Sequence, residues 1–347
     1  MNATLSQTFH GKNLSLLVWL TTALTLAAAN AAGFPGRIPD AYAQPATLVT
    51  VANGRHLNLR CAGHGEPTIV LEAGSHADSS TWFRLQPLLA QSRRVCAYDR
   101  AGYGFSDEGP MPRNLDADVV DLHGLILKAP LTTPVVLVGH SLGSNIVRHY
   151  ADKYPRDVVG LVLIDPPQQD TVAFAPAWMK AETATSKQRF VFIHQCEKGA
   201  EKGLLASPPE NLKLCISRAN PLANAKVNAA TVAYKLKPAF WRTLLSELHD
   251  NDVVFAQPVS AHETHGSTPL VVLTADNTYA DAPTELRKKL EAARDVTQTR
   301  IVATSTNGKR IFVKNTSHDI QIDQPQAVAN AVTALVAELE ASKKPKS

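Results

Sequence analysis

The sequence predicts an α/β fold in which a mostly parallel sheet is flanked by helices and interrupted by a helical insertion. Short β-rich runs alternate with helical patterns along most of the chain, which is the signature of βαβ units. Residues 134–138 form an uninterrupted apolar run, as expected of a central strand covered on both faces. The alternation stops after residue 165 and resumes near 268. We therefore expect a core made of residues 44–165 and 268–342, with a helical cap at residues 166–267.

The expected elements begin with a hairpin, because Asn53-Gly54 is the strongest short-range turn signal and separates two β-rich runs. Aliphatic and β-branched runs predict the strands, and apolar residues three or four apart predict the helices. Strands are expected at residues 47–51, 56–61, 68–72, 94–98, 134–138, 160–165, 269–274 and 310–314. Helices are expected at residues 81–89, 115–127, 142–154, 284–294 and 327–341.

Composition excludes several classes of protein. Of the 347 residues, 44% are hydrophobic and 19% are charged, which is typical of a globular chain and not of a disordered one. The formal net charge is only +4, and the basic residues are scattered except for Lys343, Lys344 and Lys346. A nucleic-acid-binding protein needs a concentrated basic face, so we expect no nucleic-acid partner.

The N-terminal segment has the features of a secretory signal peptide. Lys12 precedes a charge-free apolar run at residues 14–29, which is shorter than the roughly 20 residues of a membrane-spanning helix. Small residues at 29–31 fit a cleavage site, and those at 41–43 fit a later one. We expect a signal peptide at residues 1–31, with cleavage as late as 43, and a periplasmic or secreted protein without a stable membrane span. A retained membrane anchor is the alternative.

The main chemical signal is Gly139-His140-Ser141-Leu142-Gly143, a G-x-S-x-G motif between an apolar strand and an amphipathic helix. This context predicts a nucleophile elbow, in which a strained turn lifts the serine hydroxyl above the sheet. Such a turn packs so tightly that the positions two before and two after the serine must be nearly free of side chain, as both glycines are. Ser141 is therefore the candidate nucleophile; the alternative is an incidental serine in a glycine-rich turn.

With this motif, the sequence resembles the α/β-hydrolase superfamily, and within it the capped bacterial serine esterases and lipases. The resemblance runs from about residue 48 to about residue 339. Four blocks carry it, at residues 70–76, 96–106, 139–143 and 317–325. In such proteins the segment that matches Asp99-Arg100 is structural and braces the loop beside the active site, so we do not count it as catalytic.

A serine nucleophile needs a base, and the base in turn needs an acid that orients it. His318 follows the last strand, where the superfamily places its histidine. The acid is less settled, because Asp276 stands where most members have a glycine and Tyr279 stands at the usual acid position. Asp165, which ends the strand before the cap, is our preferred acid, as in related esterases; Asp276 or an acid such as Asp281 is the alternative.

Acyl transfer also needs donors for the developing oxyanion, usually two backbone N–H groups. We assign them to Leu142, directly after the nucleophile, and to Ser75, in the loop after strand 68–72. The side chain of His140 should face away from Ser141. His262 and His265 lack the glutamate spacing of a zinc protease and are interpreted as loop residues. No metal or organic cofactor is implied.

The expected activity is hydrolysis of a small-molecule carboxylic ester through an acyl-enzyme. Amide or peptide cleavage, like that of a proline iminopeptidase, and lactone opening are alternatives, because each passes through the same intermediate. Halide and epoxide chemistry is disfavoured, since those relatives have an aspartate where this chain has Ser141. A non-catalytic binding protein with a hydrolase fold is the alternative from a different class.

The four cysteines permit full pairing, as is common in an exported protein. Cys196 and Cys215 are expected to pair within the cap. Cys61 and Cys96 are the second candidate pair, because the fold places their two strands side by side, although strand geometry often forbids such a bond. Four free, buried thiols are the alternative.

Overall fold

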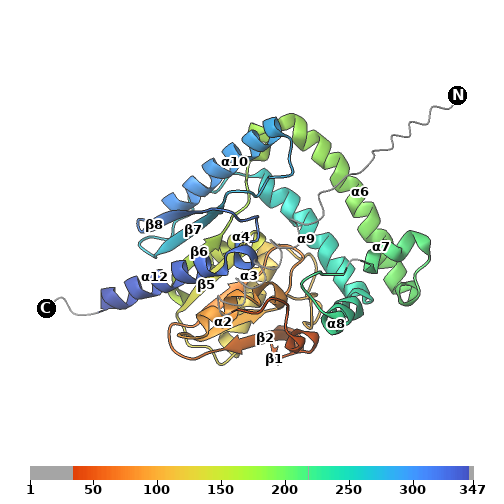
Figure 1. Cartoon of the computed structure of the whole chain (residues 1–347), viewed down its shortest axis with the longest axis horizontal. Helices are drawn as coiled ribbons and strands as arrows, with labels where there is room; N and C mark the ends of the chain where they lie inside the picture. The colour runs from red at the N-terminus through yellow and green to blue at the C-terminus, as the bar shows by residue number, and fades with distance from the viewer. Residues whose placement is uncertain (1–33, 218, 344–347) are drawn as a thin grey trace, which may run out of the picture.

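The computed structural model describes residues 34–217 and 219–343, and it confirms the predicted fold class (Figure 1). The predicted signal peptide lies outside the described residues. Eight strands form one sheet in the order β1-β2-β4-β3-β5-β6-β7-β8; β2 is antiparallel to both of its neighbours, and the other pairs are parallel. The strands are β1 Thr47–Thr50, β2 His56–Ala62, β3 Ile69–Glu72, β4 Val95–Tyr98, β5 Val135–His140, β6 Val158–Ile164, β7 Leu270–Ala275 and β8 Gly308–Val313.

Helices cover both faces of this sheet and bury an apolar cluster on each. On one face lie α3 (Leu115–Lys128) and α4 (Leu142–Lys153), and on the other lie α2 (Leu85–Leu89) and α12 (Pro325–Lys343). The central strands β5 and β6 are almost wholly buried, as a strand covered on both faces must be. The remaining core elements are η1 Asp40–Ala43, η2 Ala52–Gly54, η3 Ser79–Trp82, η4 Pro155–Asp157, α10 Thr284–Ala303 and α11 Ile320–Asp323.

Two expected helices have different bounds in the structure. The helix expected at 81–89 is divided into η3 and the shorter α2, and η3 begins earlier than expected because Asp78 caps it by accepting the N–H of Ser80. The helix expected at 284–294 continues as α10 to Ala303. Its second half buries polar side chains, so a pattern of apolar residues underestimates its length.

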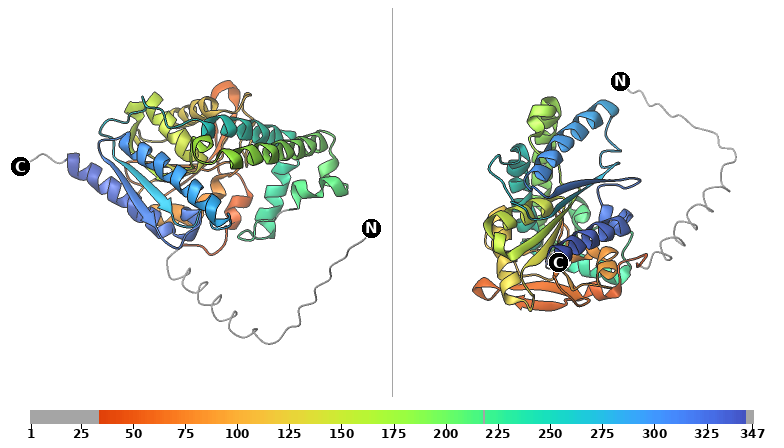
Figure 2. Two further views of the ribbon diagram at one scale, coloured as in Figure 1. Left: turned by 90° about the horizontal axis from the view of Figure 1, so that it is seen from above. Right: turned by 90° about the vertical axis from the view of Figure 1, so that its left-hand side faces the viewer.

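The segment between β6 and β7 is helical. Its two long helices, α6 (Pro176–Glu201) and α9 (Pro238–Ala256), lie side by side and extend beyond the sheet (Figure 2). The segment has its own apolar cluster, in which Trp241 and Phe240 are buried. Its shorter elements are α5 Thr171–Phe174, η5 Leu204–Ala206, η6 Glu210–Leu212, α7 Lys213–Ile216 and α8 Ala225–Lys235. We keep the name cap for residues 166–267, whose helices extend from Thr171 to Ala256.

The structure contains both expected disulfides. Cys196–Cys215 joins α6 to α7 within the cap. Cys61 and Cys96 are directly opposite one another on the antiparallel strands β2 and β4, so their side chains project from the same face of the sheet. None of the helices in residues 34–217 and 219–343 combines the length and the hydropathy that a membrane crossing requires.

Residues 34–44 form an arm that joins the cap to the core. The N–H of Ile38 donates a hydrogen bond to the carbonyl of Leu222 in the cap at 2.9 Å. On the core side, the hydroxyl of Tyr42 donates to Gln86 Oε1 at 3.2 Å. The Ile38 side chain is buried between the two parts. The arm is therefore part of the folded unit.

If the expected signal peptide is removed, this packing favours the earlier of the two expected cleavage sites. Removal of residues 34–43 would expose apolar surface, and the burial of Ile38 alone is worth about 1.5–3 kcal/mol. We therefore expect the exported chain to begin before Phe34, as cleavage at residues 29–31 would produce. Intact mass and N-terminal sequencing of the exported protein measure this directly, and a mature chain that begins at Gln44 would contradict it.

Candidate active site

Ser141 lies on the turn between β5 and α4 and has φ 52° and ψ −122°. A positive φ combined with this ψ is a strained conformation that a serine rarely adopts without support from its surroundings. The two glycines of the motif allow it. A Cβ on Gly139 would lie 2.4 Å from the carbonyl oxygen of Gly143, and one on Gly143 would lie 2.4 Å from the carbonyl oxygen of Glu72. The turn therefore has the packing that the sequence motif predicts.

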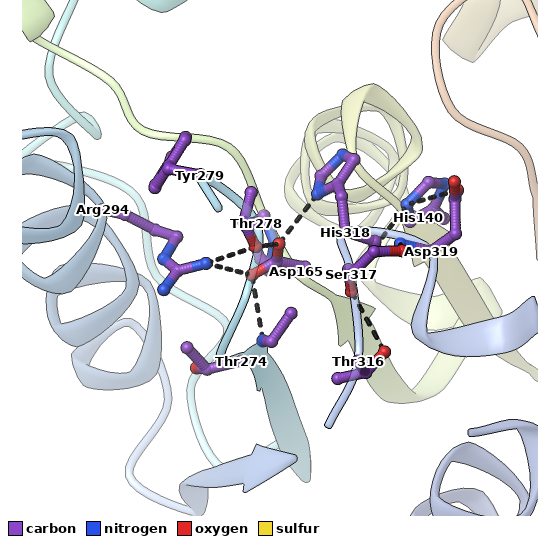
Figure 3. Close-up of polar contacts among 12 residues, drawn as sticks. His140, Asp165, Thr274, Thr278, Tyr279, Arg294, Thr316, Ser317, His318 and Asp319 are labelled. Atoms are coloured by element: carbon purple, nitrogen blue, oxygen red, sulfur yellow. Dashed lines mark hydrogen bonds and ion pairs between the residues drawn. The ribbon is translucent and has the colours of Figure 1, made fainter. Parts of the chain in front are cut away.

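Asp165 follows β6, directly beside this turn. The N–H of Ser141 donates to the carbonyl of Ile164 at 3.0 Å, so the two strand ends are adjacent. Asp165 also has a positive φ, 42°, and its side chain is fully buried. Its Oδ2 lies 2.8 Å from Nδ1 of His318, which is in the loop between β8 and α11 (Figure 3). The structure thus brings the preferred acid and the predicted base into hydrogen-bonding contact.

The carboxylate of Asp165 has further donors around it. Thr278 donates to Oδ2 at 2.5 Å and Arg294 of α10 donates to Oδ1 at 3.3 Å (Figure 3). Gln298, also of α10, donates to Oδ1 at 3.2 Å. Burial would raise the pKa of Asp165, but the hydrogen bond and charge of His318, together with Arg294, hold it below its usual value. Asp165 is therefore an ionised, hydrogen-bonded carboxylate, suited to fix the orientation of an imidazole.

The alternative acids lie elsewhere. Asp276 does not contact the ring of His318; its carboxylate accepts the N–H groups of Asn315 at 2.8 Å and Thr316 at 3.1 Å. It therefore braces the loop that carries the histidine. The hydroxyl of Tyr279 donates to Gln168. The guanidinium of Arg294 lies over the ring of Tyr279, 5.2 Å from the centre of that ring. Asp281 is exposed.

His140 lies against residues 314–319, the loop that carries His318, which we call the histidine loop. Its Nε2 is 3.1 Å from the carbonyl oxygen of His318, and the two ring centres are 4.7 Å apart (Figure 3). Burial and, to a smaller extent, the charge of the neighbouring His318 lower the pKa of His140 to about 3. A neutral imidazole that donates to this carbonyl helps to hold His318 in place without adding a charge.

The loop after β3 lies against Ser141, the candidate nucleophile. A Cβ on Gly74 would be only 3.2 Å from Cβ of Ser141, so the backbone of residues 73–76 is in contact with the turn. Leu142 is the first residue of α4, and its N–H has no partner within the helix. Backbone N–H groups from both assigned positions, Ser75 and Leu142, therefore belong to segments that meet at Ser141.

A cavity of about 520 Å³ reaches the two loops next to the site: its lining includes His76 and Asp319 but neither Ser141 nor His318. It lies between the loop after β3, the histidine loop, the cap and the N-terminal arm, and its volume is typical of a small-molecule site. Its walls mix apolar and polar side chains. They include Ile38, His76, Asp78, Thr81, Phe83, Leu222, Thr231, Tyr234, Asp319 and Ile322.

His262 and His265 belong to a different part of the molecule. Nε2 of His265 is 3.1 Å from Glu263, whose carboxylate also binds Arg148. Across the described residues, no group of three or more histidine, cysteine, aspartate or glutamate side chains is arranged to hold a metal ion.

Sequence reasoning missed the residues that support the site. Thr278, Arg294 and Gln298 surround Asp165, and the last two are one turn apart on α10, a spacing that could have marked a buried polar face. On the cap helix α9, Glu247 and Asn251 have the same spacing and are also buried. The signal in both helices is a polar pair on the face that packs against the core.

The comparisons place this chain in a family. The model of the alpha/beta hydrolase family matches residues 62–331, and the chain belongs to this family. It is 36% identical over 112 residues to the protein YqjL of Bacillus subtilis, across 32% of this chain and 44% of that protein. It is 31% identical over 110 residues to an AB hydrolase superfamily protein of Gibberella zeae, across 30% and 34%. The chain thus matches less than half the length of these two relatives.

Solved structures show the same fold at low identity. A thermophilic esterase from Thermogutta terrifontis matches with a TM-score of 0.53 and 21% identity, across 84% of this chain and 98% of that chain. CarC, a serine hydrolase involved in carbazole degradation, matches with a TM-score of 0.55 and 18% identity, across 84% and 98%. The chain is thus a hydrolase-family protein, with esterases and serine hydrolases among its structural neighbours.

The contact between Asp165 and His318 can be tested without an activity assay. A proton on His318 Nδ1 that is bonded to a carboxylate should resonate far downfield of an ordinary imidazole N–H. The resonance, measured by NMR with ¹⁵N-labelled histidine, should disappear in Asp165→Asn, which offers a neutral partner, and remain in Asp276→Asn. The opposite pattern would show that Asp276 is the partner in solution.

Proposed function

We propose that this chain is a serine hydrolase that cleaves carboxylic esters through an acyl-enzyme intermediate. The observation that carries the proposal is the 2.8 Å contact between Asp165 and His318, made beside a serine on a strained strand-to-helix turn. A serine, a histidine and an acid supplied by three separate loops at one edge of a sheet are the parts that this chemistry needs. The family and its esterase neighbours support the same reaction class.

Each proposed residue has one task. His318 takes the proton of the Ser141 hydroxyl as that oxygen attacks the ester carbonyl, and later returns it to the leaving alcohol. Asp165 orients the imidazole and stabilises its charged form. The backbone N–H groups of Ser75 and Leu142 stabilise the oxyanion of the tetrahedral intermediate. Water then hydrolyses the acyl-enzyme by the same route.

The cavity next to the site supports a small-molecule ester as the substrate. At about 520 Å³ it would take a ligand of modest size, and its walls offer both apolar surface and hydrogen-bonding groups. Amide and lactone hydrolysis use the same residues, so a screen of acyl chain lengths, lactones and p-nitroanilides separates these substrate classes. A binding protein without activity would hydrolyse none of them.

We propose that the protein acts outside the cytoplasm, in the periplasm or the medium. Two disulfides, Cys61–Cys96 and Cys196–Cys215, support this compartment because such bonds persist where the environment is oxidising. The apolar segment at residues 14–29 supports it as well.

Replacing the nucleophile tests the reaction class. Ser141→Ala should lower kcat by about 10⁴–10⁶-fold, because base and acid then have no hydroxyl to activate. Labelling by a fluorophosphonate should disappear in the same variant, while its circular dichroism spectrum stays unchanged. A variant that keeps more than about a tenth of the activity would rule out Ser141 as the nucleophile.

The acid is tested by a matched pair of substitutions. Asp165→Asn should lower kcat by about 10³–10⁴-fold, because an amide favours the wrong tautomer of His318. Asp276→Asn should stay within about tenfold, since its carboxylate binds the backbone of the histidine loop and acts on the ring only through screened electrostatics. If Asp276→Asn were the inactive variant and Asp165→Asn the active one, the assignment would be reversed.

A further inference from the structure

The loop that carries the proposed oxyanion donor is fixed by a buried arginine. Arg100 donates to the carbonyl oxygens of Ala73 at 2.6 Å and Gly74 at 2.7 Å, and it also binds Glu72 at 2.8 Å. The carbonyl of Gly74 and the N–H of Ser75 belong to the same planar, trans peptide unit and point in opposite directions. Holding that carbonyl therefore sets the direction of the Ser75 N–H.

A carboxylate from the cap holds the next peptide unit. Oε1 of Glu247, on α9, accepts the N–H of His76 at 2.8 Å and the hydroxyl of Ser75 at 2.6 Å. Its Oε2 accepts from Arg100 at 2.8 Å. One turn further along α9, Asn251 donates to the hydroxyl of Ser75 at 3.1 Å. Both peptide planes that flank Ser75 are thus held in fixed orientations.

These contacts leave one amide of the loop for the substrate. The N–H of His76 is occupied by Glu247, whereas no residue among those that the structure describes accepts a hydrogen bond from the N–H of Ser75. Burial would raise the pKa of Glu247, but the charge of Arg100 and the three hydrogen bonds hold it below its usual value. The carboxylate of Glu247 is therefore ionised at neutral pH, and both of its oxygens accept hydrogen bonds.

We propose that Glu247 is a positioning residue that makes the oxyanion hole depend on the docked cap. This inference rests on the proposed function. Glu247 touches no reacting atom; it acts through Arg100 and the loop at residues 73–76. Because the carboxylate is attached to α9, the Ser75 N–H has its working orientation only while that helix lies on the core. Closure of the cap over a substrate and completion of the catalytic machinery are then one event.

The test compares Glu247→Ala and Glu247→Gln with a matched control. Glu108→Gln breaks another carboxylate–arginine pair between α9 and the core, in which Arg242 donates to Glu108 at 2.8 and 2.7 Å without touching the loop. Activity is measured with an ester substrate, and the concentration of active sites is titrated with a fluorophosphonate. The inhibition constant of a trifluoromethyl ketone is measured as well, because its adduct with Ser141 carries an oxyanion.

Glu247→Ala should lower kcat per titrated site by about 10- to 100-fold with little change in KM, since a small misplacement of a donor has this effect. Glu247→Gln should lower it by about tenfold, because one amide oxygen cannot serve three donors. The trifluoromethyl ketone should lose affinity by a similar factor in each variant. Glu108→Gln should keep kcat and inhibitor affinity within about twofold of the wild type, as a surface pair contributes little.

Equal kcat and inhibitor affinity in Glu247→Gln and the wild type would overturn the positioning role, as would equal losses in Glu247→Gln and Glu108→Gln. If Glu247→Ala does not fold, Glu247→Gln decides the question, because it conserves the size of the side chain. Failure of the proposed function would be distinct: there Ser141→Ala would remain active, whatever the Glu247 variants did.

Discussion

The close approach of α4 to the end of β3 is the constraint on which the candidate site depends. With hydrogen as its only side chain, Gly143 lets the helix start against the carbonyls of Glu72 and Ala73, where a Cβ would lie 2.4 and 2.7 Å from them. This contact brings the turn at Ser141 against the loop at residues 73–76. A displacement of the helix would therefore move both Ser141 and the N–H of Leu142 away from the loop that carries the other proposed oxyanion donor, the N–H of Ser75.

Buried charge is the second organising feature. Arg100 lies among three carboxylates, those of Glu72, Glu247 and Asp118. Burial raises the pKa of Glu72 to about 7 and that of Asp118 to about 6, whereas that of Glu247 is lowered. A buried charge is costly unless it is paired and hydrogen-bonded, and Glu247 has the best-matched set of donors. Of the three carboxylates, Glu247, which joins the cap to the loop, is thus the one whose ionised form is most strongly favoured.

Much of the core could be predicted from the sequence, because its signals are local. The turn at Ser141 needs glycines at two nearby positions, and the strand that ends at Asp165 is a continuous apolar run. The supporting residues could not be predicted in this way. Arg294 and Glu247 act through partners more than 100 residues away, and a polar side chain on a helix has the same local pattern whether it is buried or exposed. The arrangement of the cap helices could not be predicted from the sequence either, because it is decided by packing contacts among α6, α7 and α9.

The topology also has a consequence for how the chain folds. The pairing of β6 with β7 closes a loop of more than 100 residues, and the contact between Asp165 and His318 spans 153. The entropic penalty of closing such a loop grows only slowly with its length, but non-local pairing is slow to form. Hydrogen bonds within the nucleophile turn can form early, whereas the acid meets its histidine only after the C-terminal strands have joined the sheet. The contact between Asp165 and His318, on which the proposed activation of Ser141 depends, therefore forms late, after β7 and β8 have joined the sheet.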